Sequence, residues 1–220
     1  MSPKKLWDSS TMKITLNHYT PLLVCSNAIR TCWQSFDKSD DGGEKDQELI
    51  DRVGNKFKHA STLEHLVYNF YIKGISRALL QELARHRMAS PSVKSTRYTL
   101  KELKNEESFD VKDVERASKY LVMTGVELVD EMSIRALENL RLVLLQGISN
   151  DKAKYCLPES YKTELTWTIN ARSLQNFLTL RSDKSALWEI QNLAHALYDA
   201  LPEEHKYLFS VKETTMGVQS

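Results

Sequence analysis

The sequence lacks the features that mark several large protein classes. Its three cysteines (Cys25, Cys32 and Cys156) form no CxxC pair and are odd in number. They argue against a disulfide-stabilised scaffold and for a reducing compartment, so we expect a cytoplasmic protein. No GxGxxG or GxxxxGK[ST] occurs among the seven glycines, so no Rossmann dinucleotide site or phosphate-binding glycine loop is expected. No Cys/His cluster has zinc spacing, and no metal site is predicted.

Strong charge imbalance and long apolar runs are missing as well. The net charge is +1, so no overall field draws the chain to nucleic acid or to a membrane, and neither is an expected partner. No run approaches the roughly 18 apolar residues of a membrane-spanning helix. The opening MSPKKLWDSS has no apolar core of a signal peptide. With 220 residues, 41% of them apolar, we expect a single domain over 1–220.

Hydrophobic periodicity predicts interspersed strands and helices. Alternation predicts strands over 13–19, 65–74, 95–100 and 163–169. Three- and four-residue spacing predicts helices over 26–33, 44–58, 75–89, 110–147 (as two helices, with Gly125 a candidate break), 171–181 and 185–201, and a short helix beginning at 150–151 and ending before Pro158. Helices are in the majority, so the predicted fold class is α+β.

Positive charge gathers in one acid-free stretch. Between Leu83 and Lys101 there is no Asp or Glu, whereas Arg85, Arg87, Lys94 and Arg97 stand among serines and threonines. Cations at the end of a helix complement its dipole, and this alone would explain Arg85 and Arg87. The cations continue past Pro91, however, and a strand over 95–100 would place Ser95 and Arg97 on one side. Guanidinium forks suit phosphate, so the stretch predicts an anion pocket in which carboxylates would compete for the arginines.

A second concentration of polar groups lies on the helix predicted over 171–181. Asn170 fits its N-cap, and Arg172 and Asn176 are four residues apart and share a face. Arg181 follows Leu174 and Phe177 on the apolar stripe, where an unpaired charge is costly. Either it is paired or it snorkels to solvent at the helix end, and the sequence leaves both open.

Four sequence blocks together carry a family resemblance. They are HASTLEH (59–65), RHRMASPSVKS (85–95), AKYCLP (153–158) and NARSLQNFLTLR (170–181). In order and spacing they resemble the flavin-dependent thymidylate synthases, whose signature is RHR, seven residues and a serine. The resemblance spans about residues 14–200. The sequence departs from the family pattern at Glu82, usually glutamine, at Ser92-Val93-Lys94, often Asn-Glu-Gln, and at Lys154, usually arginine.

The resemblance implies a fold, a reaction and an assembly. The fold would be α+β, with an antiparallel sheet flanked by helices. The enzyme would be a transferase of dTMP biosynthesis that methylates dUMP reductively without a protein nucleophile. Methylene-tetrahydrofolate would supply the carbon and NADPH the electrons, through bound FAD. The assembly would be a homotetramer with FAD at subunit interfaces.

The resemblance also assigns site residues by position. The residues that resemble FAD contacts are Ser61, Arg85, His86, Arg87, Asn170, Arg172 and Asn176. Those that resemble dUMP contacts are Glu82, Arg85, Ser95, Arg97, Lys154 and Arg181. Of these, Arg181 is the expected catalytic residue, because it would stabilise charge developing on the uracil ring.

Two alternatives come from other classes. The basic stretch over 85–101, with Tyr98 as a stacking platform, is also compatible with a nucleic-acid-binding module. It could equally dock an acidic partner in a structural protein without catalysis. Bound flavin would exclude the first, and NADPH oxidation stimulated by dUMP would exclude the second.

Overall fold

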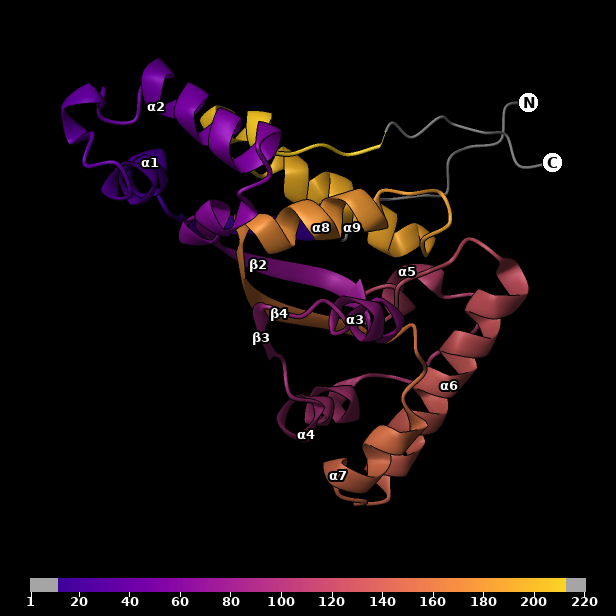
Figure 1. Ribbon diagram of the computed structural model, residues 1–220. Coiled ribbons are helices and arrows are strands. Elements are labelled where there is room, and N and C mark those ends of the chain that lie inside the picture. The colour runs from indigo at the N-terminus through magenta and orange to yellow at the C-terminus, as the bar shows by residue number, and fades with distance from the viewer. Residues whose placement is uncertain (1–11, 213–220) are drawn as a thin grey trace. The chain divides into compact units, whose positions relative to one another are not determined.

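The computed structural model describes residues 12–212, which divide into two compact units (Figure 1). The α6 unit, named after helix α6 (Glu127–Leu145), comprises Lys73–Gln81 and Ser92–Leu165. The α8 unit, named after helix α8 (Ala171–Arg181), comprises Ile14–Ile72, Glu82–Pro91 and residues 166–212. The single domain expected over 1–220 stays a prediction. No helix within residues 12–212 combines the length and the apolar character needed to cross a bilayer.

Strands and helices alternate along the chain, as the periodicity indicated. The strands are β1 (Lys13–Tyr19), β2 (Val67–Ser76), β3 (Ala89–Val93) and β4 (Lys162–Asn170). The remaining helices are α1 (Leu22–Thr31), α2 (Glu44–Ile50), α3 (Arg77–Leu83), α4 (Thr96–Thr99), α5 (Val114–Ala117), α7 (Asn150–Ala153) and α9 (Trp188–Asp199). Short 3-10 segments used below are η4 (Ala60–His65), η5 (Leu100–Asn105), η6 (Lys154–Cys156) and η7 (Glu203–Leu208). The predicted class, α+β with an antiparallel sheet flanked by helices, is confirmed.

The four strands form one sheet in the order β1-β2-β4-β3. Strand β4 buries every second side chain, including Trp167 and Ile169, which confirms the strand predicted over 163–169. In the α8 unit, Phe177 of α8 packs edge-on against Trp167, with ring centroids 5.2 Å apart. Asn170 ends β4 and caps α8, because its side chain accepts a hydrogen bond from the Ser173 amide at 2.9 Å.

Strand β2 runs two residues further than predicted. The sequence suggested an end at Gly74, but the strand continues to Ser76, and Gly74 within it adopts a φ of 78°, a conformation that side chains disfavour. The Ser76 hydroxyl then accepts from the Leu79 amide at 3.0 Å and stabilises the first turn of α3.

The helix predicted over 75–89 is wrong beyond Leu83. Helix α3 ends at Leu83, and the chain turns through Met88 at a φ of 60°. Residues 89–93 then join the sheet as edge strand β3. Such a strand tolerates Pro91, which has no amide hydrogen to donate. Sheet pairing therefore overrides the local helix propensity.

The strand predicted over 95–100 is also wrong. Residues 96–99 form α4, and the chain continues as η5. Leu100 and Leu103 enter the core of the α6 unit beside Leu137 and Leu140, and a three-residue spacing of buried side chains fits a helical turn. Strand alternation therefore does not place Ser95 and Arg97 on one side.

The helix predicted over 44–58 is regular only to Ile50. It continues as a π-helical segment, Asp51–Lys56, and Phe57, inside the predicted range, is exposed. Gly54 lies against Leu63, where an added Cβ would come within 2.7 Å of a side-chain carbon. Of the helical region expected over 110–147, the second half is present as α6, with Gly125 at a φ of 79° just before it, but the first half is wrong: only α5 is helical there, and Leu121 bridges to Tyr161.

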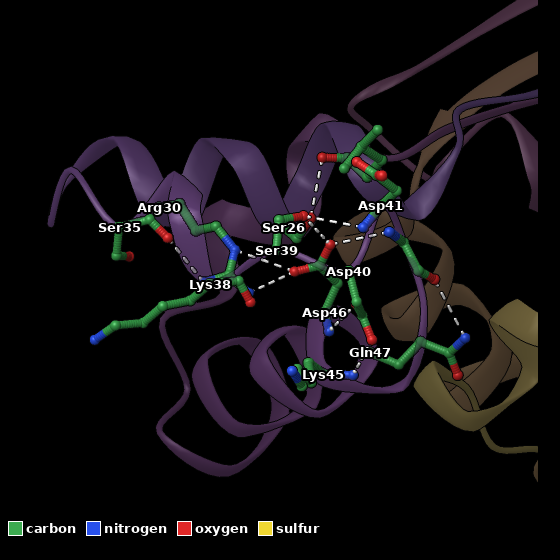
Figure 2. Close-up of polar contacts among 12 residues, drawn as sticks. Ser26, Arg30, Ser35, Lys38, Ser39, Asp40, Asp41, Lys45, Asp46 and Gln47 are labelled. Atoms are coloured by element: carbon green, nitrogen blue, oxygen red, sulfur yellow. Dashed lines mark hydrogen bonds and ion pairs between the residues drawn. The ribbon is translucent and has the colours of Figure 1, made fainter.

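A buried ion pair holds the loop between α1 and α2. Figure 2 shows Asp46 of α2 close to Arg30 of α1 and to Ser39 of the loop. Arg30 donates to the Asp46 carboxylate from Nη2 at 2.5 Å and from Nε at 3.1 Å, while Ser39 donates to it at 2.6 Å. Arg30 also donates to the backbone carbonyls of Ser35 and Lys38, both at 3.1 Å. The pair thus satisfies loop carbonyls that would otherwise lack partners.

We expect Asp46→Ala to destabilise the chain strongly. Burial alone raises the pKa of Asp46, but hydrogen bonds from Ser39, Arg30 and the Gly42 amide together lower it to about 2. Removing one partner of a buried pair typically costs about 3–5 kcal/mol. Since the pKa is depressed, this stabilisation is complete above the unfolded value near 4 and is lost as the pH falls towards 2. Urea denaturation at pH 7 and pH 3 measures both effects.

Lys56→Ala is the matched control, because Lys56 pairs with Asp51 at 2.9 Å with a side chain that is 70% exposed. An exposed pair contributes about 0–1 kcal/mol. Equal free energies of unfolding for the two variants would contradict the stabilising role of the Arg30–Asp46 pair.

Candidate functional site

The α8 unit contains a hollow of about 950 Å³ that brings most of the predicted flavin residues together. It is bordered by the start of α8, the loop after α3 and the segment after α8. Its lining residues are Glu64, Arg85, His86, Arg87, Met88, Asn170, Arg172, Ser173, Asn176, Leu180, Arg181, Ser185 and Ala186. The volume lies within the range of small-molecule and cofactor sites.

Helix α8 presents polar groups from its first two turns. The Ala171 amide donates to the Leu66 carbonyl at 2.8 Å, which fixes the start of the helix beside β2. Arg172 and Asn176 are exposed and both line the hollow, as their four-residue spacing predicted. Arg172 forms an ion pair with Glu64 of η4 at 2.7 Å. Ser61 also lies in η4, which packs against α8, but it does not line the hollow.

The loop after α3 presents the RHR motif. Arg85 and Arg87 are exposed, whereas His86 is half-buried with its ring edge-on to Phe177 at 4.8 Å between centroids. Met88 closes the loop at a φ of 60°, which is uncommon for a residue with a side chain. Backbone conformations of this kind cluster at functional sites, where the surrounding structure stabilises them.

Arg181 is held at the apolar face of α8 by two partners. Its side chain is only 18% exposed, and its Nη1 lies 3.0 Å from Glu82 Oε2. Its Nε donates to His86 Nε2 at 2.7 Å. The arginine is therefore paired with Glu82 and does not snorkel freely to solvent.

The contact with Arg181 defines the state of His86. Because a guanidinium only donates, His86 Nε2 must be an acceptor, so the ring is neutral with its proton on Nδ1. Burial and then the neighbouring Arg181 charge lower the pKa of His86 to about 4. The ring is consequently neutral across the physiological pH range.

The hollow is positively charged. Arg85, Arg87, Arg172 and Arg181 line it, and Glu64 is the one carboxylate among its lining residues. Arg87 has no ion-pair partner within residues 12–212, while Arg85 is 3.9 Å from Glu82. Such a surface suits an elongated anionic ligand bound by guanidinium forks.

The other predicted residues lie in the α6 unit. Ser95 precedes α4, and Lys154 begins η6 directly after α7, which packs against α4. Arg97 pairs with Asp151 at 2.7 Å, and its carbonyl accepts from the Asn150 side chain at 2.7 Å. The residues assigned to dUMP are thus divided equally between the two units.

The expectation that carboxylates avoid these cations is wrong. Acids from outside the stretch reach them: the distant Asp151 pairs with Arg97, and Glu102, directly after the stretch, and the distant Glu164 lie 3.8 Å and 3.5 Å from Lys94. The acid-free stretch excludes only local carboxylates. The lining residues without a sequence prediction are Glu64, Met88, Ser173, Leu180, Ser185 and Ala186. Glu64, Met88, Ser173 and Leu180 fall within three of the recognised blocks, whereas Ser185 and Ala186 follow α8 with no local signal.

Comparison with known proteins identifies the family. Residues 15–205 match the model of the family described as "Thymidylate synthase complementing protein". The chain is 73% identical over 202 residues to the flavin-dependent thymidylate synthase of Wolinella succinogenes, covering 92% of this chain and 99% of the relative. It is 74% identical over 198 residues to that of Campylobacter jejuni, covering 90% and 96%.

A solved structure is similar over nearly the whole chain. It is the flavin-dependent thymidylate synthase of Helicobacter pylori complexed with FAD and dUMP, with a TM-score of 0.87 and 63% identity, covering 91% of this chain and 100% of that one. The resemblance carried by the four sequence blocks is confirmed. The chain therefore belongs to the flavin-dependent thymidylate synthases, a family of methyl-transferring enzymes.

Proposed function

We propose that this chain converts dUMP to dTMP by reductive methylation, with methylene-tetrahydrofolate as carbon donor and NADPH as electron donor, through bound FAD. The observation that most directly supports this proposal is the arginine-lined hollow of about 950 Å³ in the α8 unit. The Helicobacter pylori enzyme, at 63% identity, is complexed with FAD and dUMP, which supports both ligands. Because the chain belongs to a family of enzymes, we do not retain the two alternatives, a nucleic-acid-binding module and a structural protein without catalysis.

The lining of the hollow fits FAD. The pyrophosphate needs cationic forks, and Arg85, Arg87 and Arg172 offer three at the rim. Asn170, Asn176 and the protonated Nδ1 of His86 add hydrogen-bonding groups, and Ser61 lies in the adjacent η4. FAD, when bound, supplies the hydride chemistry that no side chain of the chain can provide.

The proposed dUMP contacts are Glu82, Arg85, Ser95, Arg97, Lys154 and Arg181. Arg85, Arg97 and Lys154 offer positive charge to the phosphate, whereas Arg181 serves the uracil ring. A guanidinium donates hydrogen bonds and accepts none, so the role of Arg181 is electrostatic and not that of a base. Held by Glu82 and His86 and 18% exposed, it can stabilise charge that develops on the ring.

No side chain is proposed as nucleophile. Burial raises the pKa of the Cys25 thiol to about 12, which disfavours a thiolate. Cys32 and Cys156 are exposed and line neither the hollow nor its rim. Ser95 accepts at its carbonyl from Thr99 and Tyr98, contacts of a helix start that do not activate its hydroxyl.

The proposal includes a homotetramer with FAD at subunit interfaces and a cytoplasmic location. FAD, dUMP and folate are a large ligand load for 220 residues, which favours sites shared between subunits. The three cysteines are free, as a reducing compartment requires.

We expect Arg87→Ala to lose flavin. Arg87 lines the hollow and has no ion-pair partner in the described chain, so a ligand phosphate is its natural acceptor. A charge-assisted hydrogen bond contributes about 1.5–3 kcal/mol, or roughly 10- to 150-fold in Kd. Titration of apo-protein with FAD measures the change. Arg52→Ala, an exposed arginine of the same unit outside the hollow, should bind FAD normally. Unchanged affinity in Arg87→Ala would refute the proposed cofactor site.

We expect Arg181→Ala to lose turnover and keep flavin, because the pyrophosphate contacts proposed for FAD are Arg85, Arg87 and Arg172 and do not include Arg181. Removing one such electrostatic group typically lowers turnover by about 10²–10³-fold. Arg181→Lys keeps the charge but loses the planar fork, so it should also be poor. Flavin occupancy and dTMP formation at saturating dUMP are measured side by side.

Two further variants complete that assay. Cys156→Ala should match the parent, and Ser95→Ala should keep measurable turnover once dUMP is saturating. If Ser95→Ala binds dUMP but forms no dTMP, the proposed mechanism, which uses no protein nucleophile, is wrong. Near-normal turnover in Arg181→Ala would mean that Arg181 takes no part in the reaction.

A further inference from the structure

One wall of the hollow is formed by a short segment between α8 and α9. We call residues 183–186 the wall segment, because Ser185 and Ala186 line the hollow there. The wall segment belongs to no helix or strand. It therefore lacks the regular backbone hydrogen bonds of such elements, and other contacts must fix its position. Whatever fixes this segment also shapes the hollow in which FAD is proposed to bind.

Asp183 fixes the conformation of the wall segment. Its Oδ1 accepts hydrogen bonds from the Ser185 amide at 2.9 Å and from the Ser185 hydroxyl at 2.6 Å. Its backbone carbonyl accepts from the Ala186 amide at 3.0 Å. An aspartate that accepts from the backbone two residues later is a common way to stabilise a turn. Asp183 is not among the residues that line the hollow, so it acts on the hollow through Ser185 and Ala186.

Lys212 holds Asp183 from a segment distant in sequence. Its ammonium group forms an ion pair with Asp183 Oδ2, whereas Ser185 uses Oδ1. The hydrogen bonds from Lys212 and then from Ser185 lower the pKa of Asp183, so its carboxylate is ionised at neutral pH. The Lys212 amide also donates to the Ser182 hydroxyl at 2.9 Å, and that hydroxyl donates to the Leu178 carbonyl in α8 at 2.7 Å. Lys212 is thus attached both to the end of α8 and to the wall segment.

The chain between η7 and Lys212 follows α8. Gln175 donates to the Leu208 carbonyl at 2.6 Å, and Ser182 binds Lys212 seven residues further along the helix. Seven residues are about two turns, so both contacts lie on one side of α8. Neither Gln175 nor Ser182 is among the residues that line the hollow. Lys212 also lies beyond the part of the chain that matches the family, so family membership alone does not predict its contacts.

We infer that Asp183, oriented by Lys212, is a positioning residue that holds the wall segment in the shape that FAD requires. The inference rests on the FAD site proposed above, and it adds two residues that do not line that site. Because the Ser185 hydroxyl donates its one proton to Asp183, its oxygen can only accept a hydrogen bond from a ligand. Asp183 therefore sets both the place of Ser185 and the kind of ligand group, N–H or O–H, that Ser185 can bind.

Titration of the apo-protein with FAD tests the inference in a set of variants. Asp183→Ala removes the acceptor of both Ser185 hydrogen bonds and should raise the Kd roughly 10-fold. Lys212→Ala removes only an ion pair whose lysine side chain is 56% exposed, so it should raise the Kd by at most about 5-fold. Lys212→Arg keeps the positive charge and should bind FAD like the parent chain. Asp183→Asn keeps an acceptor for Ser185 but loses the charge, so it should resemble Lys212→Ala.

A double variant and a matched control separate this role from a general loss of charge or stability. If Lys212 acts through Asp183, Lys212→Ala should have no further effect on the Kd once Asp183 is alanine. Lys206→Ala removes another lysine ion pair of the same unit, with Glu203 of η7 at 2.8 Å, and should leave the Kd unchanged. An unchanged Kd in Asp183→Ala would overturn the inference, as would fully additive effects of the Asp183 and Lys212 substitutions.

Amide hydrogen exchange in the apo-protein gives a measure that does not depend on FAD. The Ser185 and Ala186 amides should exchange faster in Asp183→Ala and in Lys212→Ala than in the parent chain, and Lys212→Arg should restore the parent rate. Unchanged exchange in both alanine variants would show that Asp183 and Lys212 do not hold the wall segment. If the parent chain binds no FAD, the proposed function fails, and the exchange rates still decide whether these two residues hold the wall segment.

Discussion

The site depends on one arginine that lies where an unpaired charge would be costly. Arg181 follows Leu174 and Phe177 on the apolar face of α8, and its side chain is 18% exposed. Glu82 supplies the countercharge at 3.0 Å, and His86 supplies a neutral acceptor at 2.7 Å. These contacts tie the end of α8 to the loop that carries Arg85 and Arg87, so packing and ligand binding share the same residues. The Glu82 carboxylate thus provides the countercharge that offsets the cost of holding the Arg181 guanidinium at a largely shielded position.

Most cations near the hollow are already paired before any ligand binds. Arg172 pairs with Glu64, and Arg85 lies 3.9 Å from Glu82. Exposed pairs of this kind contribute only about 0–1 kcal/mol, so exchanging a carboxylate for a ligand phosphate costs little. Arg87 differs, because no carboxylate within residues 12–212 pairs with it. The arginines of this surface therefore have weak carboxylate partners within the chain, which keep the net charge near zero. A ligand phosphate, as a stronger anion, can replace these carboxylates.

Local sequence patterns correctly predicted those helices and strands whose conformation is determined by their own residues. Strand β4 alternates cleanly, Asn170 is a good cap, and the stripe of α8 placed Arg181 correctly from sequence. The failures lie where distant contacts decide. Residues 89–93 become a strand because a sheet edge is available, and Thr96–Thr99 becomes helical because Leu100 and Leu103 enter a core built by α6. The partners of Arg97 and Lys94 come from distant segments, so the acid-free stretch could not reveal them. The chemistry of the site was predictable chiefly because four separate blocks matched a family.

The most direct test of this account is the titration of His86 by NMR in the apo-protein. Burial and the Arg181 guanidinium lower the pKa of His86 to about 4, with the proton on Nδ1 in the neutral ring. The account predicts a midpoint near this value and a neutral Nδ1–H tautomer above it. Replacing Arg181 by alanine removes a nearby positive charge, so the midpoint should rise towards the ordinary value of roughly 6.5. A midpoint already near 6.5 in the parent chain, unmoved by Arg181→Ala, would mean that His86 does not hold Arg181.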